Sequence, residues 1–265
     1  MSTAVEQRRS GAAEDRGRRG VVVTGAAQGL GRAIARTLAE HGYSVVGVDV
    51  SATVTELAGE LGETGTGLVG DVRAPDVIEQ ACRAAAGLGD GLAAAVFNAG
   101  VISPGETVGY PLQEWDRVLD VNLRAAFAGA QAARPHLSDG GSVVMLSSIS
   151  ASRGFAARAS YCASKAGVDG LVRSLAMEWG PAGIRVNAVA PGTIATEMQR
   201  EMIKSGRAST AGYLDRIPLG RVGDPSEIGE AVAFLMSPRA SYITGVVLPV
   251  DGGWASGGLP AIADR

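Results

Sequence analysis

The sequence predicts a single α/β domain with a doubly wound, seven-stranded parallel sheet and helices on both faces. Seven short apolar runs, rich in β-branched residues, alternate with longer amphipathic segments along the chain. Continuously apolar strands are typical of a sheet covered on both faces, and the intervening helices supply right-handed crossovers. The 265 residues, 46% of them hydrophobic, suffice for the core of one large α/β domain.

This alternation predicts where each element lies along the chain. The strands are expected at residues 20–25, 44–50, 67–72, 93–100, 142–148, 185–192 and 245–253. The helices are expected at residues 29–41, 53–61, 75–87, 112–136, 160–180 and 225–237. Residues 193–224 break the alternation with glycine, threonine, serine and proline, which predicts a lid over a site. The catalytic domain is expected at 20–254, between a disordered N-terminal tail (1–19) and a C-terminal tail (255–265).

Composition excludes several classes of function. The formal net charge of −3 lacks the basic excess of a nucleic-acid-binding face. Two cysteines, Cys82 and Cys162, make neither a disulfide framework nor a zinc site, and no metal is expected. Residues 1–19 are too polar for a signal peptide, and no run approaches the roughly 20 apolar residues of a membrane helix. We therefore expect a soluble, cytoplasmic protein.

A glycine-rich turn follows the first expected strand and leads into the first helix. Gly25, Gly29 and Gly31 have the spacing G-x-x-x-G-x-G. Glycines there permit a tight turn and let the backbone approach a pyrophosphate, which the N-terminus of the helix attracts. The turn predicts a dinucleotide site at the start of a Rossmann fold, although a glycine-rich turn alone is a weak signal.

Asp49 ends the second expected strand, eighteen residues beyond Gly31. A carboxylate at this place can accept hydrogen bonds from both hydroxyls of the adenosine ribose and would repel a 2′-phosphate. Gln28 occupies the place in the turn where a basic residue would bind that phosphate, and no basic residue directly follows Asp49. The pattern favours NAD over NADP. The alternative is that Asp49 only caps a turn.

Two further strand ends carry candidate cofactor contacts. Asp71 is expected to end the third strand, where it could accept a hydrogen bond from an adenine amino group. Asn98, Ala99 and Gly100 end the fourth strand, and the small residues would let the backbone pass close to a cofactor. A simple turn is the alternative interpretation at both places.

A serine, a tyrosine and a lysine form the candidate chemical centre. Ser148 ends the fifth expected strand, at the edge where doubly wound folds bind ligands. Tyr161 and Lys165 are spaced i, i+4 on the following helix, so both project from one face. The ammonium and a cationic nicotinamide would lower the phenol pKa from about 10, while Ser148 would hold the substrate oxygen. The set predicts acid/base chemistry on an alcohol that loses hydride, although a Tyr-x-x-x-Lys pair also occurs by chance.

Taken in order, the motifs of the chain resemble those of the short-chain dehydrogenase/reductase family. They are "TGAAQGLG" (24–31), "GDV" (70–72), "NAG" (98–100), "DVNL" (120–123), the set Ser148, Tyr161 and Lys165, "APGTIAT" (190–196) and "DGGW" (251–254). The resemblance covers residues 20–253. The ordered set is far more specific than any one of its motifs.

The resemblance implies further roles. Asn122 would hold a water that relays protons from Lys165, whereas its own context indicates only a polar break in a helix. Lys165 would also hold the nicotinamide ribose, and Ile194 and Thr196 would meet the carboxamide. The predicted catalytic residues are Asn122, Ser148, Tyr161 and Lys165. The predicted cofactor-binding residues are Gly25, Gln28, Gly29, Leu30, Gly31, Asp49, Asp71, Val72, Asn98, Ala99, Gly100, Tyr161, Lys165, Pro191, Gly192, Ile194 and Thr196.

An assembly and a substrate pocket are also implied by the resemblance. A homotetramer, or alternatively a dimer, would pair through residues 112–136, residues 160–180 and the last strand. The pocket would be lined by residues 101–110, 150–155 and 193–219. A hydrophobic or cyclic substrate is favoured by the apolar and aromatic residues Ile102, Phe155, Met198, Met202 and Tyr213. Arg153 or Arg158 could meet an anion, and a solvated loop arginine is the alternative.

Three functions remain open at this level. The first is an NAD(H)-dependent oxidoreductase that interconverts a secondary alcohol and its ketone, with Tyr161 as general acid/base. The second is an NADPH-dependent 3-oxoacyl-thioester (acyl-carrier-protein) reductase, against which Asp49 argues. The third is a sensor that binds a nicotinamide cofactor without turnover, against which the complete catalytic set argues. The sequence does not choose the substrate or the physiological direction.

Overall fold

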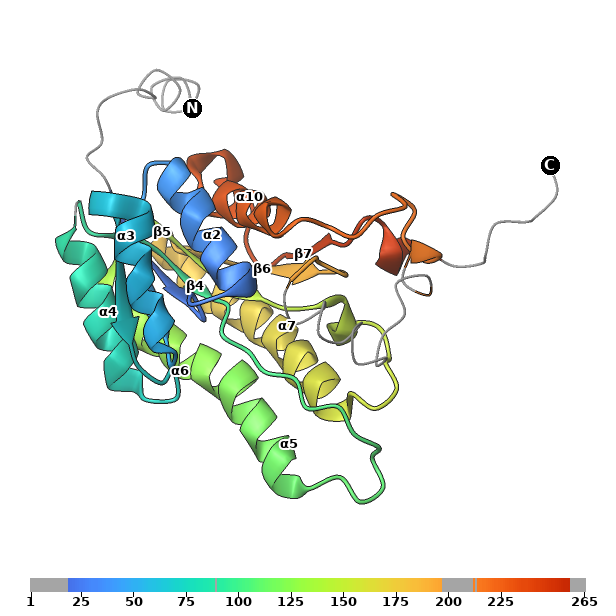
Figure 1. Cartoon of the computed structure of the whole chain (residues 1–265). Helices are drawn as coiled ribbons and strands as arrows, with labels where there is room; N and C mark the ends of the chain where they lie inside the picture. The colour runs from blue at the N-terminus through green and yellow to red at the C-terminus, as the bar shows by residue number, and fades with distance from the viewer. Residues whose placement is uncertain (1–18, 89, 197–211, 213, 258–265) are drawn as a thin grey trace.

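The computed structural model of the chain describes residues 19–88, 90–196, 212 and 214–257. Within them, seven parallel strands form one sheet in the order β3-β2-β1-β4-β5-β6-β7 (Figure 1). The strands are β1 (Gly20–Thr24), β2 (Ser44–Asp49), β3 (Gly65–Val69), β4 (Leu92–Phe97), β5 (Leu137–Leu146), β6 (Arg185–Pro191) and β7 (Val247–Val250). The order reverses between β1 and β4, which makes their carboxyl ends the switch point of a doubly wound sheet. The predicted fold class is confirmed.

Helices cover both faces of the sheet (Figure 1). One layer consists of α2 (Gly29–Glu40), α3 (Leu57–Leu61) and α10 (Pro225–Met236). The opposite layer consists of α4 (Pro75–Gly87), α6 (Ala125–Ala133) and α7 (Ala159–Trp179). The helix α5 (Leu112–Leu119) continues towards α6 below the second layer (Figure 1).

Three valines of the central strand β1 show why a strand that is buried on both faces has an apolar sequence. Val22 packs into the core beneath α4, α6 and α7, whereas Val21 and Val23 pack into the core beneath α2 and α10. All three side chains are fully buried. Successive side chains of a strand point to opposite faces of the sheet. Because helices cover both faces here, the side chains on both faces of the strand are apolar.

The helix expected at residues 112–136 is not continuous. Between α5 and α6, residues Asp120–Arg124 form a π-helical segment, and Arg134–His136 close the run as a 3₁₀ turn. A π-helical segment inserts one residue into the helical register and often marks a functional position. The predicted site residue Asn122 lies in the middle of this segment.

Several other boundaries differ from the expected ones. The strand β4 ends at Phe97, so Asn98 to Gly100 follow it, and β7 is confined to Val247–Val250. The strand β3 ends at Val69, so Asp71 follows the strand instead of ending it. The strand β5 begins at Leu137, five residues earlier than expected, because Leu137 pairs with Leu92 of β4. The helix expected at residues 53–61 begins as a 3₁₀ segment, Ala52–Glu56, before α3.

Several expectations fall on residues outside the described part of the chain. They concern the N-terminal tail before Arg19, residues 197–211 and 213 of the expected lid, and the C-terminal tail from 258. The described beginning and end of the lid segment meet in a parallel bridge between Ile194 and Gly223. No helix among the described residues combines the length and the apolar character that crossing a membrane requires.

Candidate active site

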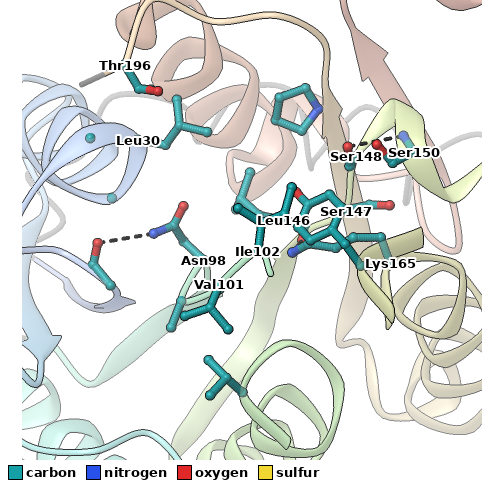
Figure 2. Close-up of a pocket in the computed structure, with 18 of the residues that line it drawn as sticks. Leu30, Asn98, Val101, Ile102, Leu146, Ser147, Ser148, Ser150, Lys165 and Thr196 are labelled. Carbon is teal, nitrogen blue, oxygen red and sulfur yellow. Dashed lines mark hydrogen bonds between the residues drawn. The ribbon is translucent and has the colours of Figure 1, made fainter. Parts of the chain in front are cut away.

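A cavity of about 590 Å³ opens at the carboxyl ends of the strands, beside the switch point between β1 and β4. Its volume suits a small-molecule or cofactor site. Figure 2 shows Leu30 and Asn98 on one side of it and Ser148 and Lys165 on the other. Every residue predicted to bind a cofactor lines this cavity. Their individual roles stay predictions.

The glycine turn between β1 and α2 leaves the backbone exposed to the cavity. Gly25 has φ +68° and Gly29 has φ +56°, a backbone conformation that favours glycine. A Cβ on Gly31 would lie 2.0 Å from the carbonyl oxygen of Gly25, whereas a Cβ on Gly29 would meet no atom within 4 Å. Gly31 is therefore required for packing inside the turn, and the open space at Gly29 fits a pyrophosphate at the N-terminus of α2.

Asp49 organises this turn and also faces the cavity. Its Oδ2 accepts a hydrogen bond from the backbone N–H of Ala27 at 3.0 Å, and its Oδ1 accepts one from Ser51 at 3.0 Å. Asp49 therefore does hold the turn, as the alternative interpretation of this residue predicted. Each oxygen keeps acceptor capacity for a further donor, so the two roles are compatible.

The candidate adenine contact, Asp71, is engaged by a neighbour. Asp71 and Arg73 form an ion pair with an N–O separation of 2.5 Å. The Arg73 guanidinium holds the pKa of Asp71 below its ordinary value, against the effect of partial burial. Arg73 also lines the cavity and was not predicted. The Asp-x-Arg spacing after the strand is the signal that could have identified it.

The end of β4 is attached to the end of β1 through Thr24, another residue that the sequence did not single out. The Thr24 hydroxyl accepts hydrogen bonds from the backbone N–H groups of Asn98 (3.0 Å) and Ala99 (3.1 Å). The Asn98 amide donates back to the carbonyls of Thr24 (2.9 Å) and Gly25 (3.2 Å). Asn98 therefore fixes the glycine turn against the neighbouring strand.

The three candidate chemical groups converge on one wall of the cavity. Ser148 follows β5, and its hydroxyl accepts a hydrogen bond from the backbone N–H of Ser150 at 3.1 Å (Figure 2). Tyr161 and Lys165 project from the first turns of α7, with Lys165 Nζ 5.8 Å from the centroid of the Tyr161 ring. Lys165 Nζ donates to the carbonyl of Leu146 at 2.6 Å.

Burial, more than charge, sets the pKa of Tyr161. Burial raises the pKa of this phenol above its ordinary value, while hydrogen bonding to Ser148 and the charge of Arg158 oppose the rise. Lys165 is not among the groups that shift it. The sequence analysis predicted a lowered pKa for Tyr161, and this prediction is wrong for the chain by itself. The pKa is raised because desolvation of the phenolate outweighs the stabilising charge of the cations in the chain. Burial also lowers the pKa of Lys165 from 10.5 to about 8.

Lys165 makes the stability of the protein depend on pH. Below about pH 8 its ammonium is charged in both folded and unfolded chains, and burying it costs about 3 kcal/mol. Between about pH 8 and pH 10.5 the folded state loses this proton before the unfolded state, so the free energy of unfolding rises with pH. From about pH 7.5 to about pH 9.5 we expect the wild type to gain about 2 kcal/mol relative to Lys165→Met in urea unfolding.

The comparison with Lys165→Met isolates this lysine, because Tyr161 titrates in both proteins. A difference in unfolding free energy that stays constant over the same pH range would contradict the lowered pKa.

Asn122 lies behind the cavity wall instead of lining it. Its amide is buried, and Nδ2 donates to the carbonyl of Val101 (2.9 Å) and the hydroxyl of Ser164 (3.0 Å). Its Oδ1 accepts from the backbone N–H of Val101 at 2.7 Å. A Cβ on Gly100 would lie 3.3 Å from this Oδ1 and 3.5 Å from Lys165 Nζ. The side chain therefore joins the π-helical segment to the loop after β4, and its role as proton relay stays a prediction.

A partly buried carboxylate, Asp169, accompanies Lys165 on α7 and was missed by the sequence analysis. Asp169 accepts a hydrogen bond from the hydroxyl of Ser147. Burial raises the pKa of Asp169, and the charges of Arg173 and Lys165 oppose the rise. The i, i+4 spacing from Lys165 to Asp169 could have indicated this pair.

The substrate side of the cavity is lined by Ile102, Phe155 and Arg158. Of the two candidate arginines, only Arg158 lines it, since Arg153 donates instead to the carbonyl of Ala255. Met198, Met202 and Tyr213 lie outside the described residues.

Comparisons with known proteins agree on one family. A family model described as enoyl-(acyl carrier protein) reductase matches residues 25–255. The chain is 40% identical, over 92% of its length, to an uncharacterized short-chain type dehydrogenase/reductase y4vI of Sinorhizobium fredii, and it spans only 45% of that relative. It is 37% identical to the 3-oxoacyl-[acyl-carrier-protein] reductase FabG of Vibrio cholerae, with 88% of this chain and 95% of that protein covered.

Among solved structures, a proposed 2-deoxy-D-gluconate 3-dehydrogenase from Agrobacterium tumefaciens with bound NADP superposes with a TM-score of 0.81. It is 37% identical in sequence, and the match covers 90% of this chain and 97% of that one. The similarity extends over nearly all of the described residues.

Proposed function

The chain belongs to the short-chain dehydrogenase/reductase family of oxidoreductases, which bind a nicotinamide cofactor, and we propose that it interconverts a secondary alcohol and its ketone with NAD(H). The observation that carries this proposal is the convergence of Ser148, Tyr161 and Lys165 on the cavity that the glycine turn and Asp49 also line. Such a cavity holds a hydride carrier and an acid/base group side by side.

In the direction of oxidation, Tyr161 acts as the general base that takes the hydroxyl proton of the alcohol. Ser148 donates a hydrogen bond to the same oxygen and holds the carbinol against Tyr161. Lys165 presents its ammonium 5.8 Å from the centroid of the Tyr161 ring, and the positive charge of an oxidised nicotinamide bound beside them would favour the phenolate against the effect of burial. A nicotinamide cofactor held in this cavity would supply the acceptor for the hydride. In the direction of reduction, Tyr161 returns the proton to the ketone oxygen.

Asp49 supports NAD as the cofactor. Its carboxylate lines the cavity at the carboxyl end of β2, where it can accept the ribose hydroxyls and repel a 2′-phosphate. Arg32 is the basic side chain nearest to the turn in sequence, and it is paired with Glu56 and Glu60 on the outside of α2. These pairs leave the carboxylate of Asp49 without a cationic partner from α2.

A second candidate function has support from the comparisons. The identity to the Vibrio cholerae reductase extends over 95% of that protein, so an NADPH-dependent 3-oxoacyl-thioester reductase is the runner-up. Asp49 argues against it, because the carboxylate would repel the 2′-phosphate of NADPH.

A substrate panel tests the proposal directly. Purified protein is incubated with NAD and linear, cyclic, steroidal and polyol secondary alcohols, and separately with NADPH and a 3-oxoacyl thioester. Turnover of an alcohol with NAD supports the proposal. Faster turnover of the thioester with NADPH would favour the runner-up, and intact NADH binding without any turnover would favour the sensor.

We also propose a homotetramer that pairs through α5, α6 and α7. Large apolar side chains are exposed on these helices: Leu112, Phe127 and Met177. Exposed apolar side chains on the helices through which family members pair support an interface there. Light scattering should give about four times 26.8 kDa. Phe127→Glu should lower this mass, whereas Leu88→Glu, at the C-cap of α4 and outside the three pairing helices, should not. A monomeric wild type would overturn the proposal.

A further inference from the structure

The contacts between β5 and α7 point to a positioning residue outside the cavity. We propose that Asp169, which does not line the cavity, fixes the hydroxyl of Ser148 against Tyr161 through its hydrogen bond with Ser147. The proposal rests on the alcohol–ketone chemistry proposed above, and it adds to that chemistry a residue that acts through Ser148.

The last residue of β5 and the two residues that follow it are each held by a side chain of α7. Figure 2 shows Leu146, Ser147 and Ser148, here called the strand end, beside Lys165 at one side of the cavity. The hydrogen-bonded pairs are Leu146 with Lys165, Ser147 with Asp169, and Ser148 with Tyr161. The three side chains of α7 are four residues apart, and residues at this spacing lie along one face of a helix. One face of α7 therefore holds the whole strand end.

The helix itself gives no reason for an aspartate at position 169. Asp169 lies in the middle of α7 (Ala159–Trp179), where aspartate is one of the poorer helix formers and is far from the helix dipole of the first turn. Burial raises the pKa of Asp169, so the folded chain disfavours its charge. Carboxylates kept in such surroundings are concentrated at functional sites. We therefore attribute Asp169 to the contact that it makes.

The alternative is a surface ion pair between Asp169 and Arg173, one turn further along α7. Arg173 is exposed and acts on Asp169 through its charge, whereas Ser147 forms a hydrogen bond with it. Ser147 is 3% exposed. A buried hydroxyl needs an acceptor, and a hydrogen bond to a carboxylate is stronger than one to a neutral group. The contact with Ser147 therefore sets the direction of the carboxylate.

This contact restricts the residue directly before Ser148. The backbone N–H of Ser147 donates to the carbonyl of Val189 at 2.8 Å, and its side chain donates to Asp169. Ser147 is thus held through both its backbone and its side chain. Ser148 follows it in an extended conformation, with φ −166° and ψ 156°. The hydroxyl of Ser148 therefore keeps one position relative to Tyr161, and a displacement of about 1 Å at such a position can cost about 100-fold in rate.

Variants of Asp169 and Ser147 test the proposal through kcat. Rates are measured with NAD and the alcohol that the substrate panel identifies. Asp169→Ala should lower kcat by about 10-fold and change KM by less than about 2-fold, because Ser148 is displaced while the pocket remains. Asp169→Asn should retain part of the rate, since its amide oxygen can still accept from Ser147. Ser147→Ala should reproduce the loss seen in Asp169→Ala.

A double-mutant cycle shows whether Asp169 acts through Ser148. In a Ser148→Ala protein, the further substitution Asp169→Ala should cost less than about 2-fold, because the hydroxyl to be positioned is absent. A loss of about 10-fold that persists in this protein would overturn the proposal. So would a wild-type rate in Asp169→Ala.

Asp224→Ala is the matched control for these variants. Asp224 also accepts a hydrogen bond from a serine hydroxyl, that of Ser226 at 2.6 Å, but it caps α10 in the opposite helix layer and does not line the cavity. Its substitution should leave kcat within about 2-fold of the wild type. A loss in this control equal to that in Asp169→Ala would show a general effect on folding and would overturn the proposal.

A measurement without turnover separates this inference from the proposed function. The backbone N–H of Ser150 donates to the hydroxyl of Ser148 at 3.1 Å, so its hydrogen exchange reports how firmly Ser148 is held. Exchange is followed by mass spectrometry of a peptide that contains Ser150. Asp169→Ala should accelerate it by about 10-fold, and Asp224→Ala should leave it unchanged.

The combined outcomes identify which proposal fails. Faster exchange in Asp169→Ala, with no oxidation of any alcohol by the wild type, would support the positioning of Ser148 and reject the proposed function. Oxidation of an alcohol by the wild type, with unchanged exchange in Asp169→Ala, would support the proposed function and reject the positioning.

Discussion

Tyr161→Phe should lower kcat for alcohol oxidation by about 10³-fold, within the range of general acid/base catalysis. The substitution removes only the phenol hydroxyl, to which the proposed mechanism assigns the proton exchange. Tyr161 projects from α7 into the cavity, and Ser148 is the hydroxyl that interacts with it directly. The ring that remains still packs beside Lys165. Affinity for NADH, followed by fluorescence titration, should therefore change by less than about 3-fold, since the phenol oxygen is a small part of the cofactor contact.

Tyr43→Phe is the matched control for this experiment. Tyr43 is also a partly buried phenol whose pKa is raised by burial. It precedes β2, at the amino end of the strands and away from the cavity. Its substitution should leave kcat within about 2-fold of the wild type. A Tyr161→Phe protein that kept most of its rate would show that another group exchanges the proton.

Asp49→Ala should reverse the cofactor preference. The substitution would remove the two charge-assisted hydrogen bonds that we propose between Asp49 and the ribose, and we expect NADH to bind about 10- to 100-fold more weakly. Removal of the negative charge should at the same time improve NADPH binding relative to the wild type. Isothermal titration with each cofactor gives the ratio of the two dissociation constants.

The ratio is the informative quantity, because Asp49 also accepts hydrogen bonds from Ala27 and Ser51. Loosening of the glycine turn would weaken NADH and NADPH alike and would leave the ratio unchanged. Asp49→Asn removes the charge while one oxygen can still accept from Ala27, so it should shift the ratio with less loss of affinity. A wild-type protein that prefers NADPH would contradict the assignment of Asp49.

Local sequence determined the turns, the strands and the helical spacing of the site residues, because backbone conformation and side-chain direction within an element depend on only a few neighbouring residues. The positive φ at Gly25 and Gly29 depends on the absence of a Cβ at those positions. The i, i+4 spacing placed Tyr161 and Lys165 on one face of a helix before any tertiary contact was known. Apolar runs such as Val21 to Val23 predicted strands with helices packed on both faces of the sheet, and the structure confirms this prediction.

Other features depended on contacts between segments distant in sequence. Leu137 extends β5 because Leu92 of β4 is available to pair with it. The π-helical segment at Asn122 accompanies hydrogen bonds to Val101, in a loop twenty-one residues earlier. Neither partner can be inferred from residues close to the position itself.

The electrostatics of the site were decided by tertiary structure alone. The sequence indicates that Tyr161 and Lys165 are neighbours, and that proximity predicts a lowered phenol pKa. Burial of both groups gives the opposite direction for Tyr161 and lowers the pKa of Lys165. Of the two arginines considered from the sequence, Arg158 lines the cavity and Arg153 does not, and this difference likewise depends on the folded loop. Desolvation and side-chain direction depend on what the rest of the chain places around a group, which no local pattern contains.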